Sequence, residues 1–216
     1  MAAAADLVGE RRPRVRGEKG AIVELSTAPP SGSTVLCLDE KGPVAAKRYR
    51  GPSWSADAHR PHFSPSYARH GYRWAFGALA HRPGAVSVAT VATRDTPAWR
   101  QFLEGLETLV PGGEVYLIAD ALPLHWTLDT MLWNWGHPRF HFVPVPKRAA
   151  WLKLIEGFWK ILDQRALAGR DCTSTELVDQ ALHAGVADWN RRPTAFLWGR
   201  PVPPKRRLKR QYVYRM

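Results

Sequence analysis

Residues 35–42 read VLCLDEKG, an apolar, strand-like run that ends in two acidic residues, Asp39 and Glu40. A carboxylate at the end of a buried strand costs desolvation energy unless a partner compensates for it. The acids therefore either mark the exit of the strand into water, or one of them holds a cation. The choice depends on whether other acids reach the same place in the fold.

A second apolar run of the same kind, EVYLIA at residues 114–119, is followed at once by Asp120. In open α/β sheets, ligands bind beyond the carboxyl ends of the strands. If the two strands are neighbours, the carboxylates of Asp39 and Asp120 face each other, which is costly without a cation between them. Mg²⁺ and Mn²⁺ prefer oxygen ligands of this type.

A third acid, Glu156, lies in the segment WLKLIEGFWKILDQRAL at residues 151–167. The apolar residues of this segment recur at helical spacing and predict a broad buried face, with Glu156 just past its edge. Taken alone, the helix favours another interpretation, a boundary glutamate that pairs with Lys160 one turn later. Placed at the end of the sheet instead, Glu156 becomes a third ligand.

The rest of the chain alternates strands and helices. We expect strands at residues 33–38, 44–49, 74–80, 86–92, 114–119 and 140–145, and helices at 96–109, 127–135, 148–167 and 173–189. Lys41-Gly42-Pro43 is expected to be the turn between the first two strands, and Thr173 with Glu176 an N-terminal capping box. This order predicts an α/β fold in which helices cover both faces of a mixed sheet.

The chain has 216 residues, 45% of them apolar, which suits one domain with a substantial core. We expect an N-terminal extension and linker at residues 1–32, the domain at 33–198 and a basic tail at 199–216. Three tryptophans are expected in the core: Trp126, Trp133 and Trp135.

The net charge of +12 favours a polyanionic partner, most often nucleic acid. Two cysteines exclude a disulfide framework, and Cys37 is interpreted as a core residue in a reducing cytoplasm. The sequence predicts no membrane span and no secretory signal. We therefore expect a cytoplasmic, nucleoid-associated protein.

The order strand-Asp, strand-Asp, helix-Glu resembles that of the DDE transposases, which have a ribonuclease-H-like fold. Over roughly residues 22–200, five blocks in order resemble the mariner-like transposases of bacterial insertion sequences. These blocks are VLCLDEKGPV (35–44), YARHGYRWAFGAL (67–79), GEVYLIADALPLH (113–125), PKRAAWLKLIEGFWKIL (146–162) and ADWNRRPTAFLW (187–198).

The resemblance implies that Asp39, Asp120 and Glu156 hold two Mg²⁺ ions, with Mn²⁺ as a substitute. One ion would activate a water, and later a DNA 3′-hydroxyl, to attack a phosphodiester, while the other stabilised the leaving oxygen. Glu40 would then be a neighbour at the strand end rather than a ligand. The implied function is hydrolysis and strand transfer during DNA transposition, on double-stranded element ends and target DNA, by a protein that usually acts as a dimer.

Further residues are candidates for contacts near the acids or with DNA. His125 matches a histidine of the family and would orient a phosphate or a water, although a histidine at a helix start with no role is equally common. Lys147 and Arg148, just before the Glu156 helix, suit backbone phosphates. Arg69 and His70 suit a loop that faces DNA, and equally a solvated basic loop.

Three positions depart from the family pattern: Ala121 replaces Asn, Ala150 replaces Ser or Cys, and Lys153 replaces Asn. Lys153 would pair with Glu156 and compete with metal, or bind a phosphate. About 32 residues precede the first strand, too few for the family's helix-turn-helix region. The chain therefore resembles a fragment, one product of a split gene whose partner polypeptide carries that region, or a decayed copy. Two alternatives stay open: a degenerate fragment that binds DNA nonspecifically, and another ribonuclease-H-like nuclease.

Overall fold

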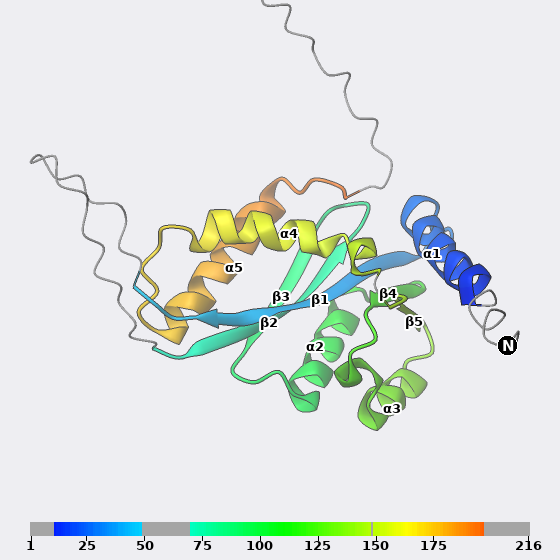
Figure 1. Ribbon diagram of the computed structural model, residues 1–216, viewed down its shortest axis with the longest axis horizontal. Helices are drawn as coiled ribbons and strands as arrows, with labels where there is room; N and C mark the ends of the chain where they lie inside the picture. Colours follow the sequence, from blue (N-terminus) through cyan, green and yellow to red (C-terminus); the bar gives the residue numbers. More distant parts are fainter. Residues whose placement is uncertain (1–10, 49–69, 148, 197–216) are drawn as a thin grey trace, which may run out of the picture.

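The computed structural model describes residues 11–48, 70–147 and 149–196, and within them five strands form one mixed sheet of order β3-β2-β1-β4-β5 (Figure 1). β1 is antiparallel to β2 and parallel to β4; β3 is antiparallel to β2, and β5 is parallel to β4. The strands are β1 (Thr34–Ala45), β2 (Tyr72–Ala80), β3 (Val86–Val91), β4 (Val115–Ala119) and β5 (Phe140–Pro144).

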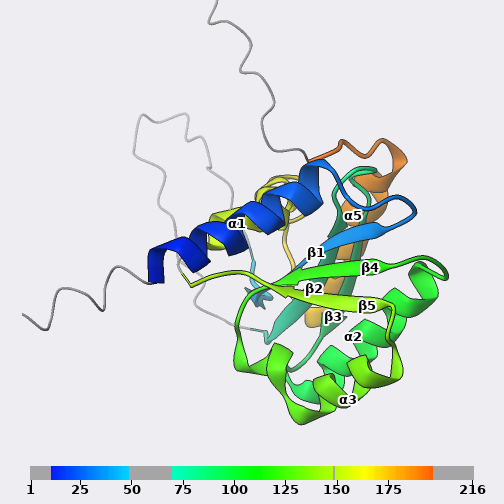
Figure 2. The ribbon, with the colours of Figure 1, turned by 90° about the vertical axis from the view of Figure 1, so that its right-hand side faces the viewer.

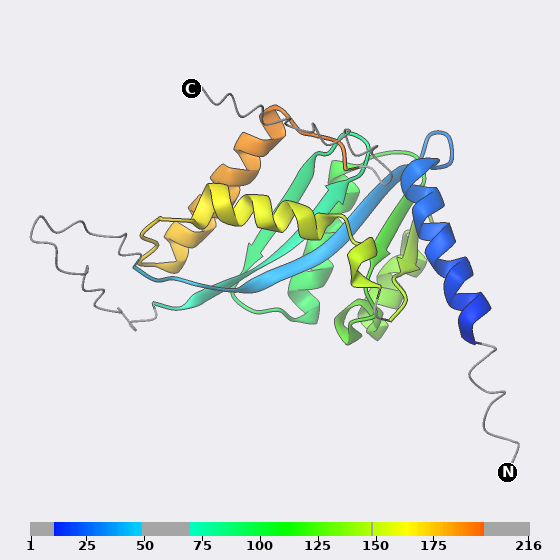
Figure 3. The same cartoon turned by 45° about the horizontal axis from the view of Figure 1, so that its top comes forward.

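Helices cover both faces of the sheet, as predicted. α4 (Ile155–Leu162) and α5 (Thr175–Arg191) lie on one face, and α2 (Thr96–Leu109) and α3 (Leu128–Gly136) on the other (Figure 1). α1 (Arg11–Thr27) lies on the α4 side, next to β4 and β5 (Figures 2 and 3). No helix among the described residues is both long enough and apolar enough to span a bilayer.

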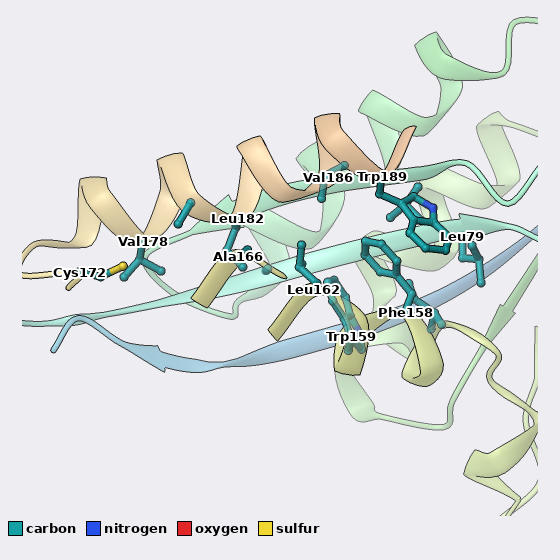
Figure 4. Packing of buried hydrophobic residues seen from close by; sticks show 14 of the residues in the cluster. Leu79, Phe158, Trp159, Leu162, Ala166, Cys172, Val178, Leu182, Val186 and Trp189 are labelled. Carbon is teal, nitrogen blue, oxygen red and sulfur yellow. The ribbon is translucent and has the colours of Figure 1, made fainter. Parts of the chain in front are cut away.

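Successive residues of β1 feed two different cores, because side chains alternate between the faces of a strand. Cys37 faces α4 and α5, whereas Leu36 and Leu38 face the α2 layer around Trp99. In the first core, side chains of α4 interlock with those of α5 (Figure 4), chiefly Phe158, Leu162, Leu182, Val186 and Trp189. Burial raises the pKa of the Cys37 thiol to about 12, so it is an unreactive core residue, as predicted.

β1 is longer than the sequence indicated. The predicted turn at residues 41–43 is wrong: the strand continues to Ala45 through a register shift between Lys41 and Val44. Gly42 makes this irregularity possible, with φ at 143°, and a Cβ there would lie 2.7 Å from the Trp74 ring. The two predicted strands are therefore two parts of one strand as far as Ala45.

The predicted helix at 148–167 is interrupted. A 3₁₀ turn, η3 (Ala150–Leu152), is followed by Lys153 in an extended conformation (φ −80°, ψ 98°), by α4, and by a π-helical end, η4 (Asp163–Leu167). The capping-box prediction was also wrong: Ser174, not Thr173, caps α5 and accepts a hydrogen bond from the Leu177 backbone N–H.

Two further outcomes concern the N-terminal segment and the tryptophans. α1 lies within the predicted extension, and its Ile22 is completely buried against Val35 and Ile118. Trp133 is in the core as predicted, but Trp135 is 84% exposed, so its assignment to the core was wrong.

Candidate active site

The parallel strands β1 and β4 bring Asp39 and Asp120 together. Their pairing ends at Cys37 and Ile118, so Asp39 lies just beyond the last paired residue and Asp120 follows β4 directly. Both carboxylates contact one ammonium group: Lys153 Nζ lies 2.5 Å from Asp39 Oδ1 and 3.1 Å from Asp120 Oδ2. The cation that compensates Asp39 at the end of β1 is therefore the ammonium group of Lys153.

The electrostatics of this cluster follow from burial and charge. Burial raises the pKa of Asp39, and the Lys153 ammonium works against that rise. Burial also opposes the charged form of Lys153, but attraction to the two carboxylates outweighs it and raises the Lys153 pKa. For Asp120, burial acts upward on the pKa, while hydrogen bonds with His125 and Lys153 outweigh it and lower the pKa. The ion pairs with Lys153 therefore oppose the effect of burial at both acids.

A second cluster of Glu40, Asp120 and His125 lies beside the first. Glu40 points to the opposite face from Asp39 and contacts His125 Nε2, while His125 Nδ1 lies 3.0 Å from the Asp120 carbonyl oxygen. The imidazole packs on the ring of Trp99. Burial opposes a charged imidazole, but the hydrogen bonds to Asp120 and Glu40 outweigh it and raise the pKa of His125 to about 9.

Sequence reasoning missed two partners in these clusters. Glu40 was interpreted as a bystander, although consecutive strand residues point to opposite faces and both faces here are buried. Trp159 was given no role, but its indole N–H donates a hydrogen bond to Asp39 Oδ2 at 3.1 Å. The alternation of the strand was a signal for Glu40, whereas nothing in the sequence indicated the indole contact.

Glu156, the third predicted acid, lies in the first turn of α4 and is half-buried. Its backbone N–H donates to the Lys153 carbonyl oxygen at 3.2 Å. Among the described residues its carboxylate forms no ion pair, so the structure shows neither the pair with Lys153 nor the pair with Lys160. Its role as a ligand stays a prediction.

The remaining predicted residues lie around this region or outside the described chain. Lys147 and His70 are exposed. Arg69 and Arg148 fall outside the described residues.

The clusters, as arranged, do not fit a divalent ion. Lys153 Nζ takes the position from which a metal would reach both Asp39 and Asp120. Atoms of Glu40, Asp120 and His125 lie within 4.8 Å of one another, but both ring nitrogens of His125 already face oxygen partners. Because a metal-binding imidazole needs a free lone pair, this second cluster does not fit either.

A comparison with protein families identifies the chain. The model for the DDE superfamily endonucleases matches residues 34–178, which include all three predicted acids and both clusters. The chain belongs to the DDE superfamily endonucleases. No curated protein matches this DDE chain.

Solved structures with the same fold include two complexes of Mos1. The Mos1 mariner paired-end complex with Mn matches with a TM-score of 0.58 and 13% identity, over 85% of this DDE chain and 60% of the other. The Mos1 strand transfer complex matches with a TM-score of 0.50 and 13% identity, over 83% and 59%. The DDE chain thus spans about three fifths of each of these transposase chains, and the likeness shows the fold.

Proposed function

We propose that this DDE chain is the catalytic domain of a DNA transposase, which hydrolyses phosphodiester bonds in double-stranded DNA and transfers the ends to new sites. The observation that supports this best is the pair of carboxylates, Asp39 and Asp120, which adjacent parallel strands place around one cation. The pair lies inside the matched endonuclease segment. A ligand role is the simplest reason to place two like charges, one buried and one part-buried, so close together.

In this proposal Asp39, Asp120 and Glu156 are the metal-binding acids. Family membership implies a divalent metal, and the proposed metal is a pair of Mg²⁺ ions, with Mn²⁺ as a substitute. Since Lys153 occupies the space between Asp39 and Asp120, the acids become available to metal only when that side chain moves.

The proposed partner is double-stranded DNA, both element ends and target. The net charge of +12 supports it, because Lys and Arg that neutralise phosphates supply most nonspecific affinity for DNA. The exposed Lys147 and His70 are proposed DNA contacts, as are Arg69 and Arg148, and His125 is proposed to orient groups at the acids. We also propose that the protein forms a homodimer, that a separate polypeptide carries the helix-turn-helix region, and that the protein is located with the nucleoid in the cytoplasm.

Nicking of supercoiled plasmid in Mg²⁺ or Mn²⁺ tests the proposal. We expect nicked and linear products from the wild type at high metal concentration, and none from Asp120→Asn. Asp188→Asn is the matched control, because Asp188 is an exposed carboxylate of α5 outside the clusters, and it should nick like the wild type.

Three results would count against this function. Equal nicking by Asp120→Asn would assign the activity to a contaminant. DNA binding without cleavage, in both the wild type and a Lys153→Asn variant, would indicate a degenerate fragment. A strong preference for RNA–DNA hybrids or four-way junctions would indicate another type of nuclease.

A further inference from the structure

Lys153 is a charged side chain buried where the sheet, α4 and the turn before α4 meet. Only 5% of the side chain is exposed, and its ammonium contacts both Asp39 and Asp120. Two carboxylates this close repel each other strongly unless a cation lies between them. Lys153 provides the compensation that a bound cation would otherwise provide.

The backbone around Lys153 fixes the base of this side chain. Its N–H donates to the Ala150 carbonyl at 2.7 Å, and its own carbonyl accepts from Glu156 at 3.2 Å. Leu152 and Ile155, close on either side in sequence, are completely buried. The base of the side chain is therefore anchored, and the ammonium reaches the acids on a flexible four-carbon stem.

Every oxygen of the acid pair already has a partner. Asp39 accepts from Lys153 on Oδ1 and from Trp159 on Oδ2. Asp120 accepts from Lys153 on Oδ2, while its Oδ1 lies 3.2 Å from His125 Nδ1. A divalent ion that entered this pair would have to displace the ammonium, because both positive charges require the same oxygens.

We propose that Lys153 is a built-in cation that closes the acid pair to divalent metal until the ammonium is displaced. The inference rests on the proposed role of Asp39 and Asp120 as metal-binding acids. A tethered ammonium competes at a high effective concentration, so it weakens the apparent affinity for metal without any change in the acids themselves. Release of Lys153, for example toward a DNA phosphate, would then couple the arrival of a polyanion to the entry of metal.

Binding of Mn²⁺ to the full chain tests this, read as loss of the free Mn²⁺ signal in electron paramagnetic resonance. We expect Lys153→Asn, which removes the charge and is too short to fill the space, to bind Mn²⁺ ~10–100-fold more tightly than the wild type, the range typical for groups next to a metal. Lys160→Asn is the matched control, since Lys160 is an exposed lysine of α4, and it should bind like the wild type. The double variant Lys153→Asn/Asp120→Asn should lose the gain.

Stability gives a second readout. Without metal, Lys153→Asn leaves the buried Asp39 and the part-buried Asp120 without a cation between them and should melt below the wild type, and Mn²⁺ should raise its melting temperature far more than that of the wild type. If Lys153→Asn is unfolded without metal, recovery of its circular dichroism on addition of Mn²⁺ supports the inference. Lys153→Gln, uncharged and closer in length, then provides the affinity comparison.

The outcomes separate the inference from the proposed function. Wild type that binds Mn²⁺ as tightly as Lys153→Asn and Lys153→Gln overturns the inference, and leaves the transposase proposal untouched. Tight binding by Lys153→Asn without plasmid nicking keeps the inference and counts against the transposase proposal.

Discussion

His81, at the end of β2, is a buried histidine whose two ring nitrogens have no hydrogen-bond partner within the described part of the chain. Burial lowers its pKa to about 4 from an ordinary value of 6.5. Between these values the unfolded chain binds a proton that the folded chain does not, so stability falls as the pH falls from 6.5 to about 4.

Replacing His81 tests whether this histidine causes the loss of stability at low pH. We expect the free energy of unfolding of the wild type to drop by about 2 kcal/mol more than that of His81→Leu between about pH 7 and about pH 5, because one pKa unit corresponds to about 1.4 kcal/mol. Urea unfolding at both pH values measures it. His183→Leu, at an exposed histidine of α5, should keep the wild-type slope; a wild-type slope in His81→Leu would contradict the prediction.

At the same scale, the sequence predicted that Asp39 and Asp120 meet, but not that Lys153 lies between them. Asp39 and Asp120 each lie at the end of an apolar run that is easily predicted as a strand. The two acids come together because those strands, β1 and β4, are neighbours in the sheet. Lys153 was expected either to pair with Glu156, three residues later on a continuous helix, or to bind a phosphate. In the structure, Lys153 instead contacts two acids that are distant from it in the sequence, a pairing that the local residue spacing does not predict.

At the scale of elements, β2 has a glycine, Gly77, at the position where the Trp159 ring packs against the sheet. Gly77 pairs with Asp39 across β1 and β2, and a Cβ on it would lie 2.5 Å from the Trp159 ring. The same Trp159 holds Asp39 through its indole N–H. The absence of a side chain at Gly77 therefore sets the height at which α4 packs above the candidate site.

Gly77→Ala should destabilise the protein by about 1–3 kcal/mol, the usual cost of overpacking a core. Chemical unfolding measures the loss, and a Trp159→Leu background, with a smaller side chain, should reduce it. Gly105→Ala is the matched control: Gly105 is exposed on α2 with free space around it, and alanine there should stabilise the helix by about 0.5–1 kcal/mol. Equal effects at the two glycines would refute this account of the packing.

Element boundaries show where sequence patterns stop being informative. Helical spacing runs without interruption through residues 151–167, yet Lys153, which contacts Asp39 and Asp120, is extended and α4 begins only at Ile155. Similarly, Gly42-Pro43 has the composition of a tight turn, but β2 pairs on both sides of it and makes it an irregularity within one strand. Both differences lie where the chain contacts partners that are distant in sequence.

For the whole molecule, the charge of +12 predicts how DNA binding should respond to salt. If the chain neutralises about six phosphates, its affinity for random duplex should fall about 10³-fold between about 50 and about 200 mM salt. Fluorescence anisotropy with a labelled duplex measures this. Asp188→Asn should keep the slope, and an affinity that does not depend on salt would contradict a phosphate-based interface.

β1 itself has two parts that should differ in local stability. At Leu36 and Cys37 it has a paired strand on each side, whereas from Leu38 to Ala45 it pairs with β2 alone. Backbone amides of the first part should exchange with deuterium only on global unfolding, while those of the ribbon beyond it open through local fluctuations. Asp39 lies near the boundary between these two parts of β1. We therefore expect the two-stranded part, from Leu38 to Ala45, to move when a large ligand approaches, while the part that is paired on both sides stays rigid.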